Sequence, residues 1–250
     1  MTADVWLSRQ RSARTPPRLR LFCLPYAGGG AQIYRNYSQA LPADVEVCAV
    51  QLPGRERRFR EPALESVDVI VDQLAPVVRE LSDRPFAIFG HSLGALVGFE
   101  LVRRLRKEGG PMPLRLFASG HRAPHLPDPD PPIHHLSDAQ FVEELRQLNG
   151  TPQEVFESPE LLELILPVLR ADFTAAEMYV YRSDAPLTCP ITALGGTNDD
   201  MIPGEALHAW QEHTARDFEA HLLEGDHFFI HQRQDDVLRI VRDRLTDARV

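Results

Sequence analysis

The chain has 250 residues, of which 43% are hydrophobic and 25% are charged, and its formal net charge is -9. This size and apolar content suit one core, so residues 1–250 are predicted to form a single domain. The acidic balance argues against nucleic acid or an anionic membrane as a partner, because both would repel the chain. No signal peptide and no run of 18 apolar residues is recognisable, so we expect a cytoplasmic protein.

After a loose tail over residues 1–17, strand and helix patterns alternate along the chain. Short apolar runs are typical of strands that are buried on both faces of a sheet. Their alternation with amphipathic segments predicts an α/β fold, a mostly parallel sheet wrapped by helices. The strands are expected at 19–24, 45–50, 86–89, 114–118, 191–194 and 218–223, and helices at 66–81, 93–107, 205–214 and 235–245.

One long segment, from about residue 121 to 187, contains no predicted strand. It opens with a Pro-rich loop and continues with two helical patterns, Ser137–Leu148 and Ser158–Tyr181, each beginning at a serine suited to cap a helix. Pro167 is expected to kink or divide the second helix. Because an insertion of this length is usually functional, we predict a helical lid, called the lid segment below.

A candidate nucleophile lies between a predicted strand and a predicted helix. Gly90-His91-Ser92-Leu93-Gly94 matches the pattern G-x-S-x-G. In such an elbow the serine has a strained backbone, and the flanking glycines avoid collisions with the adjoining strand and helix. The rival Ser119 lacks these glycines. The motif predicts Ser92 as the nucleophile of an α/β-hydrolase, with its hydroxyl at the carboxyl edge of the sheet.

A serine hydroxyl needs a base, and in this fold the chain order is serine, acid, histidine. His227 directly follows the last predicted strand, where a loop can bring an imidazole over the sheet edge. The other nine histidines lie beside the elbow, in the Pro-rich loop, on helices or within a strand, and are interpreted as structural or solvated. Asp199 and Asp200 both follow the strand at 191–194, and the residues alone do not choose between them.

The glycine-rich stretch Pro25–Gly30 ends the first predicted strand. It lacks the nucleotide-binding patterns G-x-x-x-x-G-K-[ST] and G-x-G-x-x-G. In this fold the loop here supplies one N–H of the oxyanion hole and the residue after the nucleophile supplies the other. The predicted donors are the backbone amides of Ala27 and Leu93. We predict no metal site, because the histidines of the lid segment have no fixed spacing, and no cofactor.

Several stretches together resemble the type II thioesterases of polyketide and nonribosomal peptide synthesis. The resemblance extends from about residue 18 to 245, and the lid segment is its most specific part. It includes LPYAGGGAQIYRNY, FGHSLGALVGFEL, LSDAQFVEELRQLNGTPQEVFESPE, GGTNDDMIP and GDHFFI. The resemblance implies an α/β-hydrolase fold with a helical lid. It also implies that Asp200, the second aspartate of the pair, is the acid. Many members have proline after the acid where Met201 stands here, so Asp199 is retained as the alternative.

The same resemblance implies the reaction and the partner. The enzyme would hydrolyse acyl thioesters from the phosphopantetheine arm of acyl or peptidyl carrier proteins, editing stalled or aberrant groups in antibiotic biosynthesis. The contact would be transient and the enzyme a monomer. Four arginines (Arg55, Arg57, Arg58 and Arg60) could contact an acidic carrier, although a solvated face is the favoured interpretation. The alternatives are a chain-releasing fatty-acyl thioesterase, a general carboxylesterase and a non-catalytic binding module.

Overall fold

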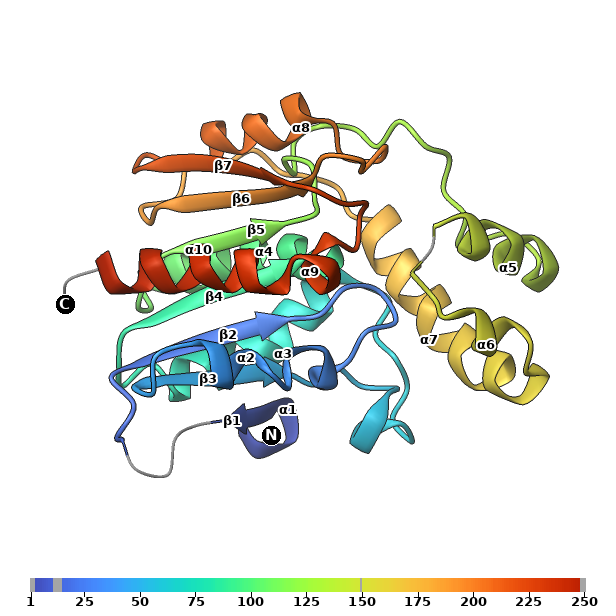
Figure 1. The fold of residues 1–250 in the computed structure, drawn as a ribbon, viewed down its shortest axis with the longest axis horizontal. Coiled ribbons are helices and arrows are strands. Elements are labelled where there is room, and N and C mark those ends of the chain that lie inside the picture. The colour runs from blue at the N-terminus through green and yellow to red at the C-terminus, as the bar shows by residue number, and fades with distance from the viewer. Residues whose placement is uncertain (1–2, 11–14, 149, 248–250) are drawn as a thin grey trace.

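The computed structural model describes residues 3–10, 15–148 and 150–247. Within these residues a seven-stranded sheet has the order β1-β3-β2-β4-β5-β6-β7 (Figure 1). In this order the six strands β3, β2, β4, β5, β6 and β7 run parallel to one another. Strand β1 pairs antiparallel with β3 at the edge of the sheet. The strands are β1 (Leu7–Gln10), β2 (Leu19–Leu24), β3 (Val45–Val50), β4 (Phe86–His91), β5 (Leu116–Ser119), β6 (Ile191–Gly196) and β7 (Phe218–Leu223).

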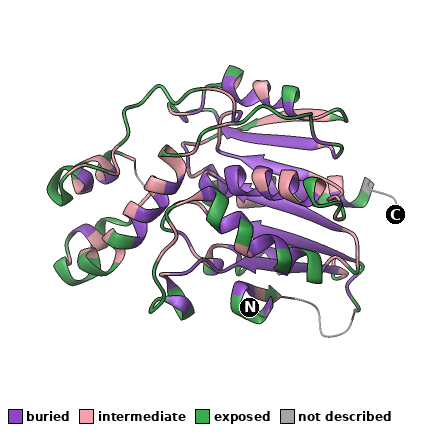
Figure 2. Cartoon of the chain, turned by 180° about the vertical axis from the view of Figure 1, so that it is seen from behind, coloured by how far each residue is buried: buried purple, intermediate pink, exposed green. Residues whose placement is uncertain are grey.

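Helices cover both faces of this sheet. On one face α3 (Val67–Glu80) and α4 (Leu93–Lys107) pack together, and α1 (Ala3–Trp6) contacts α3. On the other face lie α2 (Tyr37–Ala40) and α10 (Gln234–Asp247), which contact each other (Figure 1). Strands β2 to β6 are therefore buried along their whole length (Figure 2), which explains why their residues are mainly apolar. The predicted α/β fold is confirmed.

The lid segment forms three helices beyond the carboxyl ends of the strands (Figure 1). They are α5 (Asp138–Gln147), α6 (Gln153–Phe156) and α7 (Pro159–Glu177). Ser137 caps α5 together with Gln140, and the hydroxyl of Ser158 accepts a hydrogen bond from the amide of Leu161 at 3.3 Å. Pro167 lies inside α7 and does not divide it. The helices share a small apolar cluster of their own, which includes Phe141 and Leu169.

The remaining elements are short helices in the connections between the strands and longer helices. They are α8 (Gly204–His208), α9 (Phe229–Gln232) and the 3-10 helices η1 (Ala31–Tyr34), η2 (Glu56–Arg58) and η3 (Ala209–His213). The prediction of a loose tail over residues 1–17 is wrong for Ala3–Gln10, which forms α1 and β1; residues 1–2 and 11–14 lie outside the described residues. None of the helices in the described ranges is long and apolar enough to cross a bilayer.

Candidate active site

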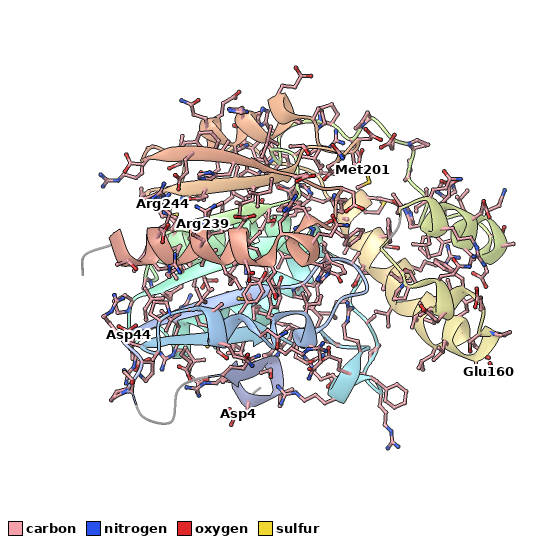
Figure 3. The ribbon with its side chains drawn as sticks, viewed as in Figure 1. Asp4, Asp44, Glu160, Met201, Arg239 and Arg244 are labelled. Carbon is pink, nitrogen blue, oxygen red and sulfur yellow. The ribbon has the colours of Figure 1, made fainter. Side chains whose placement is uncertain are left out.

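The predicted site residues follow strands that end at one edge of the sheet. Strands β2, β4, β6 and β7 are parallel neighbours or near neighbours, so their carboxyl ends come together. Met201, which follows β6, lies at this edge, which faces α7 (Figure 3). Glu160 marks the opposite, outer end of α7 in the same view. The loops that carry Ala27, Ser92 and His227 therefore converge beneath the lid segment.

Ser92 occupies a strained elbow between β4 and α4. Its backbone has φ 53° and ψ -121°, and a positive φ is costly for any residue other than glycine. A Cβ on Gly90 would lie 2.0 Å from the carbonyl oxygen of Gly94, and one on Gly94 would lie 2.2 Å from that of Leu24. Both glycines are therefore required, because backbone atoms occupy the space of any side chain. This geometry is the nucleophile elbow that the motif predicts.

The elbow is tied to the neighbouring strand β5. The amide of Ser92 donates to the carbonyl of Ser119 at 2.8 Å, and the Nδ1 of His91 lies 2.9 Å from the Ser119 hydroxyl. His91 is fully buried, and burial lowers its pKa well below 6.5 with a further contribution from His227. A neutral His91 ring therefore supports the elbow from below, with its centroid 5.2 Å from that of His227.

The imidazole of His227 pairs with Asp199, and the prediction of Asp200 at this position is wrong. His227 Nδ1 lies 2.7 Å from Asp199 Oδ2, and both residues are buried. The other oxygen of Asp199, Oδ1, accepts the Met201 amide at 3.1 Å. Asp200 is exposed. A carboxylate at Nδ1 keeps the proton on that nitrogen and leaves Nε2 free to accept one.

Strand register explains why the first aspartate is the one that reaches the histidine. Pairing between β6 and β7 continues past the strand ends, through Thr197 N to Leu223 O and Asn198 N to Gly225 O, both 2.8 Å. The chain then turns, and its next residue, Asp199, faces the loop that carries His227. The side chain of Asp200, one residue later, points to solvent.

Ser92 and His227 are brought to the same edge without a direct hydrogen bond between them in this structure. Within the described residues, the Ser92 hydroxyl has no hydrogen-bond partner, while the His227 ring contacts His91, the neighbour of Ser92. Catalytic hydrogen bonds are often long in substrate-free enzymes and shorten when a substrate binds. The arrangement thus brings a serine hydroxyl, an imidazole and a carboxylate to one edge of the sheet, in the chain order predicted for this fold.

The two predicted oxyanion donors have free amides. Within the described residues, neither the Ala27 nor the Leu93 N–H donates to another protein group. The close approach of Gly94 to the carbonyls of Leu24 and Pro25 holds the elbow against the loop that carries Ala27. Amides without an internal acceptor beside a nucleophile are available to a substrate oxygen.

A cavity of about 590 Å³ opens between the Ala27 loop and the lid segment. Gly28, Arg55 and Phe59 line one side, and Ile165 and Val168 of α7 line the other. Its wall is mainly apolar, which is typical of pockets that hold an aliphatic or aromatic group. Phe228, next to His227 in the chain, packs against Gly150 of the lid segment, where a Cβ would lie 2.4 Å from its ring.

The other histidines have structural partners, as predicted. Within the described residues no group of three or more His, Cys, Asp or Glu side chains is arranged to hold a metal. Burial lowers the pKa of both His121 and His213 to about 4. The contacts are His121 with Arg122 O, His125 with His213, His134 with Glu177, His208 with Gly204 O, His221 with Glu219 and His231 with Tyr26.

The basic cluster is a solvated face only in part. Arg55 and Arg58 are buried, at 7% and 4% exposure, and are paired with Asp172 and Glu61 respectively. Arg57 and Arg60 are exposed. Sequence reasoning missed Asp172, whose position inside an amphipathic helix gives no local signal that it contacts the glycine loop.

The thioesterase family model, described as a thioesterase domain, matches residues 19–245. The thioesterase PikA5 of Streptomyces venezuelae is 39% identical over 99% of this chain and 88% of its own. A protein named linear gramicidin dehydrogenase LgrE, of Brevibacillus parabrevis, is 50% identical over 90% of this chain and 87% of its own. The solved type II thioesterase BorB from the borrelidin biosynthetic cluster superimposes with a TM-score of 0.88 at 39% identity, covering 98% of this chain and 99% of BorB.

The matched region includes the elbow, the acid loop, the histidine loop and the whole lid segment. The resemblance to type II thioesterases is thereby confirmed in both sequence and fold. The chain belongs to the thioesterase family and is a serine hydrolase with the α/β-hydrolase fold.

Proposed function

We propose that this thioesterase hydrolyses acyl thioesters on the phosphopantetheine arm of acyl or peptidyl carrier proteins, editing stalled or aberrant groups in polyketide or nonribosomal peptide biosynthesis. The observation that carries the proposal is the strained Ser92 elbow at the same sheet edge as the His227–Asp199 pair, with an apolar cavity lined by Ala27 and the lid segment nearby. The relatives PikA5 and BorB support the pathway, because one is named a thioesterase and the other a type II thioesterase of a biosynthetic cluster.

In the proposed mechanism His227 takes the hydroxyl proton of Ser92 as its oxygen attacks the thioester carbonyl. Asp199 holds the proton on Nδ1, so that Nε2 is the basic nitrogen, and stabilises the imidazolium that forms. The amides of Ala27 and Leu93 donate to the oxyanion of the tetrahedral intermediate. His227 then protonates the leaving pantetheine thiol. An acyl-serine remains, and water activated by His227 releases the free acid.

The name of one relative raises a second activity, dehydrogenation, for which a dinucleotide cofactor site would be one requirement. A dinucleotide site requires amides that are free to bind a pyrophosphate at the start of a helix. Here the Gly28 amide already donates to the Asp172 carboxylate at 2.7 Å and is not free to bind a phosphate. The glycine loop continues into a four-residue 3-10 helix, which offers a weak dipole. The geometry therefore favours hydrolysis.

The decisive experiment compares acid release from a carrier protein loaded with a short acyl group and from a matched simple ester. Wild type and Ser92→Ala are assayed in parallel. Faster cleavage of the carrier thioester that is lost in Ser92→Ala supports the proposal. Activity on the ester alone would instead indicate a carboxylesterase, and retained activity in purified Ser92→Ala would refute the nucleophile.

An acyl-length series on the same carrier separates editing from chain release. Preference for short groups supports editing, whereas preference for long saturated chains would indicate a chain-releasing fatty-acyl thioesterase. If the folded protein hydrolysed none of these acyl groups, a non-catalytic binding module would be favoured. A monomeric state and a cytoplasmic location stay predictions, which gel filtration and cell fractionation check.

A further inference from the structure

A buried carboxylate of the lid segment contacts the glycine loop directly. Asp172 lies in the second half of α7, has 0% exposure, and accepts the Gly28 amide through Oδ2 at 2.7 Å. The side chain of Leu169, one helical turn earlier, packs on the same glycine, where a Cβ would lie 2.5 Å from its Cδ2. Helix α7 therefore touches the residue that immediately follows the proposed oxyanion donor Ala27.

The turn that presents Ala27 is fixed by two hydrogen bonds, one on each side. The Gly29 amide donates to the Tyr26 carbonyl at 2.9 Å, which orients the peptide that contains the Ala27 N–H. Gly28 has φ +77°, while Ala27 is not among the positive-φ residues, and this combination is a type II turn. The Gly28 N–H lies on the peptide that follows the one carrying the Ala27 N–H. The bond from Gly28 to Asp172 therefore holds the turn in place against α7, and the Ala27 N–H moves with that turn.

The charge of Asp172 is balanced by Arg55. The two side chains form a bidentate pair, with Nη1 to Oδ2 at 2.5 Å and Nη2 to Oδ1 at 2.8 Å. Arg55 also donates to the carbonyl of Gly29 at 3.1 Å and to that of Pro53 at 3.2 Å. An unpaired carboxylate this close to the hole would disfavour a developing oxyanion. Arg55 removes that penalty and binds the glycine loop, its own loop and α7 together.

We propose that Asp172, with Arg55 as its counter-ion, is a positioning residue for the oxyanion hole, so that seating of the lid helix α7 sets the position of the turn that carries the Ala27 amide. This inference rests on the proposed role of Ala27 but not on carrier-protein recognition. Displacement of that turn reduces stabilisation of the transition state and leaves binding of the ground state nearly unchanged.

The test compares two double variants, since a single substitution would leave a buried unpaired charge and could unfold the protein. R55M/D172N removes both charges and retains an amide oxygen that can accept the Gly28 N–H. R55M/D172L removes the same charges and the acceptor. Both are assayed with an acyl N-acetylcysteamine thioester and with an alkyl boronic acid, which forms a tetrahedral adduct on Ser92. Thermal melts establish that each variant is folded.

We expect kcat of R55M/D172L to be at least about tenfold below that of R55M/D172N, because an ångström-scale misplacement of a catalytic group costs up to about a hundredfold. KM should agree within about twofold, and boronate inhibition should weaken by the same factor as kcat. Equal kcat and equal inhibition in two folded variants would overturn the proposal. R55M/D172A replaces the leucine variant if that variant does not fold. If neither acceptor-free variant folds while R55M/D172N does, the contact serves folding alone, and the proposal is overturned in that case too.

If the wild-type enzyme showed no Ser92-dependent hydrolysis of the N-acetylcysteamine thioester, the proposed active site itself would be refuted. Active wild type with indistinguishable double variants would be a failure of this inference only. The two results therefore remain separate.

Discussion

Replacing Asp199 by asparagine is expected to lower kcat about 10⁴-fold, while the same change at Asp200 leaves it within about twofold. The substitution keeps size and removes charge, so the loop should retain its fold. Asp199 uses its two oxygens differently, since Oδ1 accepts the Met201 amide and Oδ2 faces His227 Nδ1. An asparagine has one oxygen, which stays with the amide donor, and its NH₂ group then faces the imidazole.

An NH₂ group at Nδ1 can only donate, so Nδ1 must lose its proton and Nε2 must carry it. The nitrogen that should accept the serine proton is then blocked, and the charge that stabilises the imidazolium is gone. A 10⁴-fold loss corresponds to about 5 kcal/mol of transition-state stabilisation at about 1.4 kcal/mol per tenfold. Asp200 is exposed and contributes neither effect.

Thiol release from an acyl thioester, followed under single-turnover conditions, measures the acylation step directly. Asp199→Asn and Asp200→Asn are compared at equal thermal stability. If Asp200→Asn lost activity and Asp199→Asn kept more than a tenth of it, the assignment of the acid from geometry would be refuted. A loss in both would show that the loop acts as a unit.

Three further outcomes follow from the structure. Gly90→Ala should destabilise the fold by more than about 3 kcal/mol in thermal melts, because its Cβ meets a backbone carbonyl at 2.0 Å. Gly98→Ala, in the following helix α4, meets only side chains, the nearest at 3.1 Å, and should be mild. Burial, with smaller contributions from the nearby charges of His125 and Arg103, lowers the pKa of His213 to about 4. The contribution of His213 to the free energy of unfolding should therefore be fully present above pH 6.5 and be lost as the pH falls from 6.5 to 4. The free energy of unfolding of His213→Gln, measured with urea, should depend less on pH. Ile165→Trp, in the cavity wall, should reduce turnover of long acyl groups more than short ones, while Leu161→Trp on the exposed side of α7 should not.

The sheet could be predicted from sequence because its signals are local. A strand buried on both faces needs a mainly apolar run, and the runs at 19–24 and 45–50 match the buried strands β2 and β3 residue for residue. The run at 218–223 likewise matches β7, although β7 is only partly buried. β1 could not be found in this way. Its sequence, Leu7-Ser8-Arg9-Gln10, buries one apolar side chain, and it exists through antiparallel pairing with β3, a contact that is distant in the chain.

The nucleophile was predictable for a different reason, which also explains the error at the acid. The elbow needs glycines at fixed positions two residues either side of the serine, and such a steric demand is visible in five letters. The acid needs only to face a histidine that comes 27 or 28 residues later in the chain. Which member of the pair does so depends on where the pairing of β6 with β7 ends and the chain turns.

The arginine cluster shows where charge patterns mislead. Four arginines among six residues suggest a solvated surface, because an isolated buried guanidinium is very costly. Two of them are nevertheless buried, since each has a carboxylate and backbone carbonyls within hydrogen-bond distance. The partner of Arg55 lies 117 residues away, on a helix of the lid segment. A buried ion pair of this kind contributes little net stability but is costly to break, so it fixes one arrangement of the elements that it joins. Here those elements are the lid helix and the loop that offers the Ala27 amide, which is why we assign the pair to positioning rather than to stability.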